Sequence, residues 1–505
     1  MKVCLINPPT SRAQDEVFFP MGLITVGSVL RENGVAAELV DFDLQLRLHP
    51  ELRDGFSKFQ DFARDEIAGR DAEAFGISSI CSNFPFAFEL AELIREEHPN
   101  AKIVMGGPQP SSVAPESMAY CPAIDAIVVG EGELTFLELL RSDWSPSALA
   151  KIQGLCYRAE DGIRLSEPRP LIEDLDTLPF PDFSLVDVEE YRKHSCSLAL
   201  LEAGRGCPFR CNFCSTAEMW VRKYRVKSPA RIAEEMRRLH HKFGMSYISL
   251  THDNFSTSPK YLRKFCHYFI DNGLQGFTWN ASARTDTLKI DDLDLMQRAG
   301  CRGVFFGVDS GSKRVQDLID KHLDLEEYKL ILGETVKRGI SAISSFILGF
   351  AEETHEDLNA TIELGLWSKY AGSGEVQFHR LAPLASTKIY AQHFKDLNYS
   401  PVVSDISFII FPEASVLQKI QANPRLFSSY FEVPLPLVRD LDLFCFSNFY
   451  HALVNDIGAS LYWYLKKTGK TPIEFYQEWY SQNREAEYTQ LLKKPYVLDT
   501  VAECF

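Results

Sequence analysis

Three cysteines in one short loop constrain this chain more than any other feature of its sequence. Cys207, Cys211 and Cys214 follow the spacing C-x-x-x-C-x-x-C between Gly204 and Ser215. Glycine and proline in this stretch predict a loop. Thiolates this close on a loop can all turn towards one soft metal centre. On a four-iron cluster, three thiolates would leave one iron free to bind a chelating substrate.

A single zinc ion is an alternative for the same cysteines. A structural zinc site takes four ligands, and the nearest further candidates, Cys196 and His194, precede the loop instead of following it. Three structural thiols without metal are a second alternative. If the cysteines bound zinc, the chain would be a scaffold stabilised by a metal ion and not an enzyme.

Composition narrows the class of protein. A chain of 505 residues suggests two or three domains. A net charge of −16 without a basic tract argues against a nucleic-acid substrate, because nothing would neutralise a phosphate backbone. Twelve cysteines and no signal peptide predict a cytoplasmic protein in a reducing compartment. The longest apolar stretches are too short to predict a membrane span.

Residues 1 to about 145 alternate short apolar runs with helical patterns such as Leu23–Glu32 and Phe86–Glu97. This alternation predicts a parallel, doubly wound sheet, which binds ligands at the carboxyl ends of its strands. The predicted strands are Val3–Ile6, Glu38–Phe42, Phe75–Ile80, Ile103–Met105 and Ala126–Val129. The candidate ligand contacts at their ends are Asn7, Pro8, Ser78, Ser79, Gly106, Gly107, Gln109, Gly130, Glu131 and Gly132. The sequence therefore predicts a Rossmann-like binding domain, whose glycines let backbone approach a bulky ligand.

Residues 146–195 resemble a connector, since prolines in Glu167–Pro170 and Leu178–Asp182 cannot continue a helix or a central strand. We expect it to pack on both neighbours. In residues 196–394 the strand and helix alternation resumes, which predicts part of an α/β barrel with its site at the strand ends. The predicted strands are Tyr247–Leu250, Phe277–Ala281, Gly303–Val308, Ile343–Gly349 and Glu375–Leu381. A helix is predicted to begin after Ser228 and to end at Gly244.

Polar side chains follow the predicted barrel strands at the point where each strand ends. Asp253, Ser282, Arg284, Asp309 and Ser310 are the candidates for ligand contact. Each could also be a capping or loop residue, and their joint order on consecutive strands favours a site.

Residues 395–505 are aromatic-rich and mainly helical, with helices predicted over Phe444–Leu465 and Tyr476–Tyr488. This region either caps the site and contacts the substrate or packs on the outer helices of the barrel for stability.

The cysteine motif, with Phe213 before its last cysteine, resembles the radical S-adenosylmethionine (SAM) superfamily. The segments Asn7–Pro9, Pro20–Leu23, Gly106–Gly107 and Gly130–Glu133 resemble the cobalamin-binding domain that precedes many radical SAM cores. The resemblance covers roughly residues 1–390. It implies a cobalamin-binding domain over 1–145, a linker, a partial (β/α)6 barrel over 196–394 and a C-terminal region.

The resemblance also implies three cofactors. The three cysteines would hold a 4Fe–4S cluster whose fourth iron is chelated by SAM. SAM contacts would come from Phe213, Asp253, Ser282, Arg284, Asp309 and Ser310, where Asp309 replaces the family's usual glutamate. The ten strand-end residues of the first domain would contact cobalamin. The Asp-x-His-x-x-Gly loop is absent, so we expect no histidine on cobalt. A domain of the same fold that binds no cobalamin is the alternative.

The activity implied by the family is C-methylation of a natural-product or peptide substrate. The reduced cluster cleaves SAM to a 5′-deoxyadenosyl radical, which takes hydrogen from an unactivated carbon, and methylcobalamin delivers the methyl group. A reductant such as flavodoxin or ferredoxin would be a partner, and the enzyme would be oxygen-sensitive. The alternative is a radical rearrangement, cyclisation or epimerisation, with cobalamin non-methylating or absent.

Overall fold

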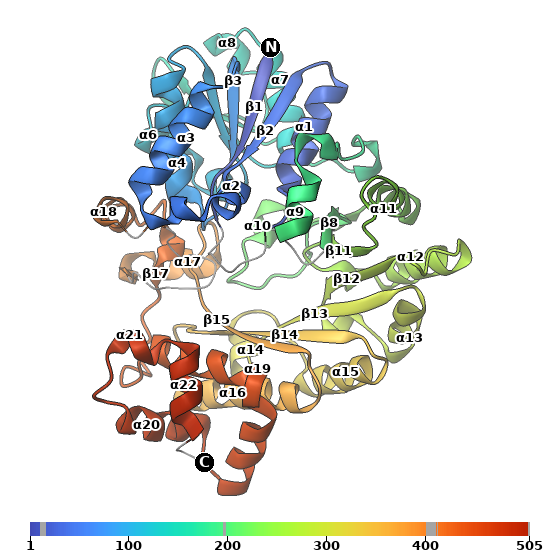
Figure 1. The fold of residues 1–505 in the computed structure, drawn as a ribbon, viewed down its shortest axis with the longest axis vertical. Coiled ribbons are helices and arrows are strands. Elements are labelled where there is room, and N and C mark those ends of the chain that lie inside the picture. Colours follow the sequence, from blue (N-terminus) through green and yellow to red (C-terminus); the bar gives the residue numbers. More distant parts are fainter. Residues whose placement is uncertain (11–16, 195–197, 400–410, 412, 503–505) are drawn as a thin grey trace.

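Two sheets organise the computed structural model, which describes residues 1–10, 17–194, 198–399, 411 and 413–502. The first sheet lies at the top of Figure 1 in blue, and the second lies below it in green to yellow. The predicted α/β class is confirmed. The predicted boundary between residues 195 and 196 lies outside the described residues. No helix among the described residues is long and apolar enough to cross a membrane.

The first sheet has seven strands in the order β2-β1-β3-β4-β5-β6-β7. Its first five are parallel and confirm the five predicted strands. Residues 3 to 6 of β1 are all buried, because helices cover both faces of a parallel sheet. The strands are β1 Lys2–Asn7, β2 Ala36–Asp41, β3 Ala74–Ser78, β4 Lys102–Gly106, β5 Ala126–Val128, β6 Leu155–Ala159 and β7 Gly162–Leu165.

Side chains alternate between the two faces of this sheet. Leu5 packs with α1 (Met21–Glu32) and α7 (Gly132–Arg141), whereas Ile6 packs with α3, α4 and α6. The other helices of this part are α2 Phe42–Leu48, α3 Phe56–Ala68, α4 Phe84–Glu97, α5 Pro108–Ser112, α6 Ala114–Tyr120 and α8 Pro146–Leu149.

The predicted connector contains two strands, β6 and β7, which were not predicted from the sequence because prolines nearby indicated a connector. β6 pairs antiparallel with β5, and β7 pairs with β6, so the first sheet continues past residue 145. Leu155 and Tyr157 pack in the core on one face of β6 and Cys156 packs in the core on the other, so the start of this strand is buried on both faces, whereas Arg158 is exposed.

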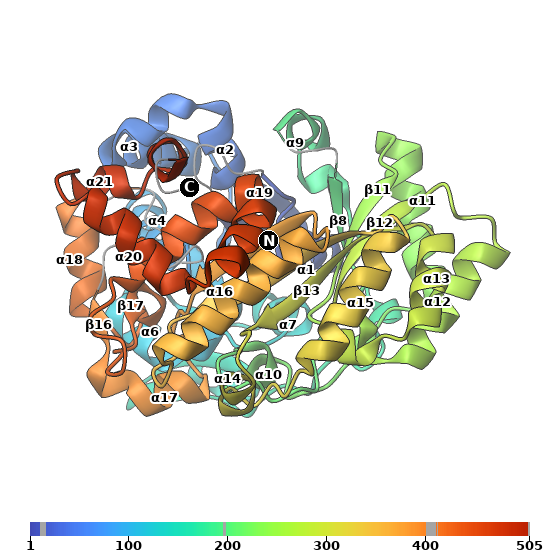
Figure 2. The same cartoon turned by 90° about the horizontal axis from the view of Figure 1, so that it is seen from below.

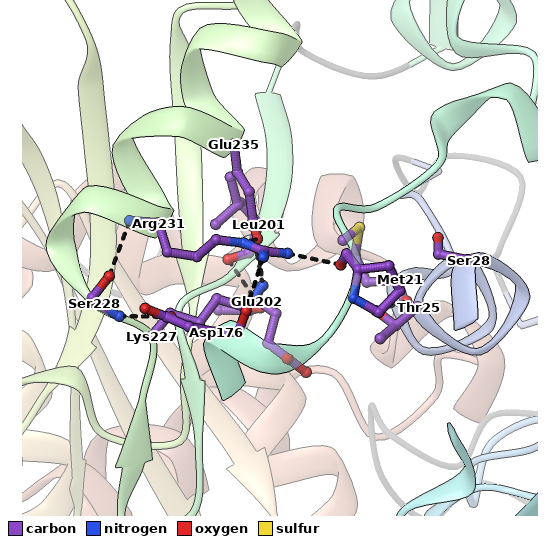
Figure 3. Close-up of polar contacts among 12 residues, drawn as sticks. Met21, Thr25, Ser28, Asp176, Leu201, Glu202, Lys227, Ser228, Arg231 and Glu235 are labelled. Carbon is purple, nitrogen blue, oxygen red and sulfur yellow. Dashed lines mark hydrogen bonds and ion pairs between the residues drawn. The ribbon is translucent and has the colours of Figure 1, made fainter. Parts of the chain in front are cut away.

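The rest of the connector contacts both neighbours. The Asp182 amide donates to Ser28 of α1 at 2.8 Å. On the other side, the Arg231 guanidinium donates to the carbonyls of Asp176 and Pro179 at 3.2 and 2.7 Å. Figure 3 shows Asp176 beside Ser228 and Arg231, with Ser28 further away on the first domain.

The second sheet is six parallel strands in the order β15-β14-β13-β12-β11-β8, with helices outside it. Ser228 caps α11 through the Arg231 amide, and Gly244 ends the helix in the left-handed region, as predicted. The strands are β8 Leu198–Glu202, β11 Tyr247–Thr251, β12 Thr278–Ala283, β13 Cys301–Asp309, β14 Ser341–Leu348 and β15 Glu375–Arg380. The helices are α9 Val188–His194, α11 Pro229–Phe243, α12 Pro259–Asp271, α13 Ile290–Arg298, α14 Lys313–Leu318, α15 Leu325–Lys337 and α16 His355–Tyr370.

The C-terminal region is mainly helical. Its long helix α19 (Leu443–Thr468) lies beside α16 and β15, as Figure 2 shows for α16. The predicted helix Tyr476–Tyr488 is wrong in its bounds. Thr471 and Glu474 form a capping box that starts α20 earlier, at Pro472, and α20 ends at Gln482. The remaining elements are α17 Lys388–His393, β16 Asn398–Tyr399, α18 Ala414–Ala422, β17 Phe431–Glu432, α21 Tyr488–Leu491 and α22 Lys494–Val501.

Candidate functional site

The cysteine loop lies between β9 (Gly204–Arg205) and α10 (Thr216–Met219), and Asp253 ties its two ends together. One carboxylate oxygen of Asp253 accepts from the Gly206 amide at 2.7 Å, and the other accepts from the Thr216 hydroxyl at 3.1 Å. Gly206 has φ +89°, and a Cβ there would lie 1.9 Å from the Lys223 carbonyl oxygen. Only glycine therefore fits at the start of the cysteine loop.

The middle of the loop is anchored from the opposite side of the barrel. The backbone and side-chain amides of Asn212 donate to the carbonyls of Ile319 and Leu318, each at 3.0 Å. The Ile389 amide donates to the Asn212 carbonyl at 3.2 Å. Phe213 packs edge-on against Phe350, with 5.6 Å between ring centroids.

The three cysteines are free thiols, each partly exposed on this anchored loop. Burial raises the pKa of Cys211 to about 11, so this thiol would have to lose a proton to become a metal ligand. Within the described part of the chain, no three His, Cys, Asp or Glu side chains are arranged to hold a single metal ion. Three soft thiol donors on one loop are a ligand set that an iron–sulfur cluster takes.

Four of the six candidate SAM contacts lie at the cysteine loop or at the barrel cavity, and the other two are paired with neighbouring side chains. Phe213, Asp253 and Arg284 lie in or against the cysteine loop, and Ser282 lines the barrel cavity described below. Asp309, in the left-handed region at φ +66°, forms an ion pair with Lys321. Ser310 is fully buried against the Thr361 hydroxyl, at 3.0 Å.

A half-open cavity of about 610 Å³ is lined by the barrel strands. Glu202, Tyr247, Ser249 and Asn280 line it and were absent from the sequence candidates. Asn280 links the strands by accepting from the Ser249 hydroxyl at 2.7 Å and donating to the Tyr247 hydroxyl at 3.1 Å. Polar residues at every second position of β11 were the sequence signal for this lining.

A second cavity, of about 250 Å³, lies against the first sheet, between it and α1 and α7. The cobalamin candidates that line it are Ser78, Gly106, Gly107, Gly130, Glu131 and Gly132, and its walls are otherwise mostly apolar. Gly107 has φ +101°, and a Cβ there would lie 2.5 Å from the Ser79 carbonyl oxygen. A glycine-lined, mostly apolar slot beside a parallel sheet fits part of a large organic cofactor.

Four cobalamin candidates do not line this cavity. Asn7 donates to Asp41 at 2.8 Å, and the Pro8 carbonyl accepts from Asn83 at 3.2 Å. Ser79 donates to Asn83 at 2.8 Å, whereas Gln109 donates to the carbonyl of Leu426 at 2.9 Å.

Glu202, Arg205 and Trp220 line both cavities and form their common wall. The guanidinium nitrogens of Arg205 form ion pairs with carboxylate oxygens of Glu131, Glu133 and Glu202 at 2.6, 2.5 and 2.9 Å. The Glu131 and Glu133 carboxylates belong to the first domain and Arg205 precedes the cysteine loop, so this buried cluster joins the two candidate cofactor sites.

The C-terminal aromatic residues lie mostly away from the cavities. Phe446, Phe449 and Tyr450 are buried among α19 and α20, and Trp463 is 57% exposed. Phe444 lines a further cavity of about 600 Å³ at the ends of β14 and β15.

Comparison with known proteins agrees with this arrangement. Residues 201–365 match the model of the radical SAM superfamily, and residues 15–140 match the B12 binding domain. An uncharacterized methyltransferase of Pyrococcus horikoshii is 31% identical over 397 residues, which are 77% of this chain and 82% of the relative. An anaerobic magnesium-protoporphyrin IX monomethyl ester cyclase of Synechocystis is 27% identical, over 71% of this chain and 70% of the cyclase.

Among solved structures, the radical SAM methyltransferase TsrM of Kitasatospora setae, with cobalamin and a 4Fe–4S cluster bound, superposes with a TM-score of 0.64. The match covers 90% of this chain and 94% of TsrM at 18% identity, so it shows a shared fold. This chain belongs to the cobalamin-dependent radical SAM methyltransferase family, whose cofactors are a 4Fe–4S cluster, SAM and cobalamin.

Proposed function

We propose that the protein methylates a carbon atom of a natural-product or peptide substrate. The observation that carries the proposal is the common wall of Glu202, Arg205 and Trp220, which puts the cavity of the B12-binding domain next to the barrel cavity. Cobalamin supplies a transferable methyl group, and the cluster with SAM supplies a radical that activates an unreactive carbon. The protein's part is to hold both reagents against one substrate and to exclude water.

In this proposal Cys207, Cys211 and Cys214 hold the cluster, and Asp253 orients their loop. The polar barrel lining, which includes Asn280, orients the substrate. The residues that line the slot of the first domain, which include no histidine, would hold part of cobalamin. In the C-terminal region, Phe444 and the separate cavity that it lines at the ends of β14 and β15 hold a further part of the substrate. A flavodoxin or ferredoxin supplies the electron, and the acidic net charge disfavours a nucleic-acid substrate.

The test is an anaerobic incubation with SAM, methylcobalamin, a chemical reductant and a library of candidate substrates. Methyl transfer yields S-adenosylhomocysteine together with 5′-deoxyadenosine, and a substrate product heavier by one methylene. Cys211→Ala is the control, and it should give none of the three products.

The similarity to the cyclase of Synechocystis favours cyclisation as the second candidate function. That outcome would give 5′-deoxyadenosine and a product of altered mass without S-adenosylhomocysteine. Such a result would remove methyl transfer and leave the radical chemistry in place.

A further inference from the structure

The guanidinium of Arg284 is almost fully engaged. Its Nε and Nη2 donate to the two carboxylate oxygens of Asp286 at 3.0 and 2.6 Å. Nη2 also donates to the Lys321 carbonyl at 2.8 Å, and the guanidinium carbon lies 3.9 Å from the ring centroid of Phe209. The side chain is only 8% exposed. These contacts hold the guanidinium plane in one orientation.

The remaining nitrogen of this group faces the cysteine loop. Nη1 lies 3.9 Å from Cys211 Sγ, which is a long contact of the kind sulfur accepts. A guanidinium can bind a carboxylate with two parallel hydrogen bonds through Nε and Nη2 or through Nη1 and Nη2, and both arrangements need a hydrogen of Nη2. The two hydrogens of this Nη2 already go to Asp286 and to the Lys321 carbonyl. Arg284 is therefore placed for the cysteine sulfur and not for the carboxylate contact that the family resemblance implies.

The surroundings keep this donor close to the loop. Lys321, which accepts from Arg284 through its carbonyl, is itself fixed by its ammonium group, which donates to the Gly307 carbonyl at 2.7 Å. The preceding residues Leu318 and Ile319 bind Asn212, next to Cys211. One short segment thus holds both the guanidinium and the cysteine loop.

We propose that Arg284 is a positioning residue that makes the iron–sulfur cluster easier to reduce by donating its Nη1–H to the sulfur of Cys211. Reduction adds one electron from an external reductant and forms or breaks no bond. The reduced cluster carries one more negative charge, which a hydrogen-bond donor and a buried cation at a ligand sulfur stabilise. The effect is strong because the guanidinium lies in a poorly solvated site. The proposal depends on the cluster and not on methyl transfer.

The experiment measures the midpoint potential of the reconstituted full-length protein without SAM, by redox titration followed by electron paramagnetic resonance. Arg284→Gln should lower the equilibrium constant for reduction at least tenfold, which is a shift of about 59 mV to more negative potential for one electron. Arg284→Lys keeps the charge but cannot bind Asp286 and reach Cys211 together, so it should shift the potential less, in the same direction. Arg263→Gln is the matched control, because Arg263 also pairs with an aspartate, on the outer helices α12 and α13.

Unchanged midpoint potentials in both Arg284 variants, at a full content of four irons, would overturn the proposal. If those variants instead raise only the SAM concentration needed for half-maximal cleavage, Arg284 contacts SAM. If Arg284→Gln loses its iron, the midpoint potential of Arg284→Lys is compared with that of wild type instead. An unchanged potential in Arg284→Lys then overturns the proposal. If neither variant retains iron, Arg284 is required to hold the loop, and a tuning role is refuted. A methyl-transfer assay that failed would leave this measurement unaffected.

Discussion

Replacing Arg205 by glutamine should destabilise the protein strongly, because this side chain neutralises carboxylates from both domains. Its side chain is 5% exposed, as is that of Glu133, and that of Glu131 is 4% exposed. Arg225 also binds Glu131, at 2.8 Å, so Glu131 keeps one cation in the variant. Within the described residues, Arg205 is the one side-chain partner recorded for Glu133. The variant therefore leaves a buried carboxylate without a cation.

Breaking a buried ion pair by removing one partner costs about 3–5 kcal/mol. The free energy of unfolding should fall by that amount, which is roughly a hundredfold or more in the folding equilibrium constant. The assay is urea unfolding followed by circular dichroism and tryptophan fluorescence, with wild type and variant at the same ionic strength. Since the chain has more than one domain, the two signals are analysed separately.

Two further variants make this measurement decisive. Arg192→Gln breaks a pair with Glu189 in which the arginine is 39% exposed, so its unfolding free energy should change by about 1 kcal/mol or less. Arg205→Gln combined with Glu133→Gln removes the orphaned charge and should recover part of the loss. A change of under about 1 kcal/mol in Arg205→Gln would refute the reasoning, because buried, mutually neutralising charges cannot be separated that cheaply.

Three more predictions concern the two candidate sites and Glu353, a fully buried carboxyl group that accepts from the Gly349 amide. Cys211→Ala should lose the iron and sulfide of the cluster, measured chemically, while its far-ultraviolet circular dichroism stays that of wild type. Val26→Trp should fill the cavity that Val26 lines and abolish cobalamin binding measured by visible absorbance, whereas Leu134→Trp on the exposed side of α7 should not. Burial raises the pKa of Glu353 from 4.5 to about 8, so the folded state holds a proton that the unfolded state has lost between these values. The free energy of unfolding should therefore fall as pH rises from 4.5 to 8, and a Glu353→Gln variant that keeps this slope in urea titrations would contradict the assignment.

The sequence alone determined the features that depend on neighbouring residues. Strands β1 to β5 followed from short apolar runs, and α11 followed from Ser228, Pro229 and Gly244, because capping and periodicity are local properties. The cysteine spacing predicted an iron–sulfur loop for the same reason. The strands β6 and β7 were missed because prolines after them indicated a connector. β6 pairs with β5 in another segment, whereas β7 pairs with β6 across a short turn.

Only the tertiary structure decided which of the candidate side chains share an environment. Arg284 meets Cys211 across 73 residues, and Gln109 meets Leu426 across 317. Glu131 follows a strand end in the first domain and was predicted to contact a ligand, but its carboxylate forms an ion pair with Arg205. Such contacts depend on how whole sheets and helices pack, since the chain length between two residues does not specify the distance between them. A polar residue at a strand end is therefore predictable from sequence, but its partner is decided by the packing of elements far away in the chain.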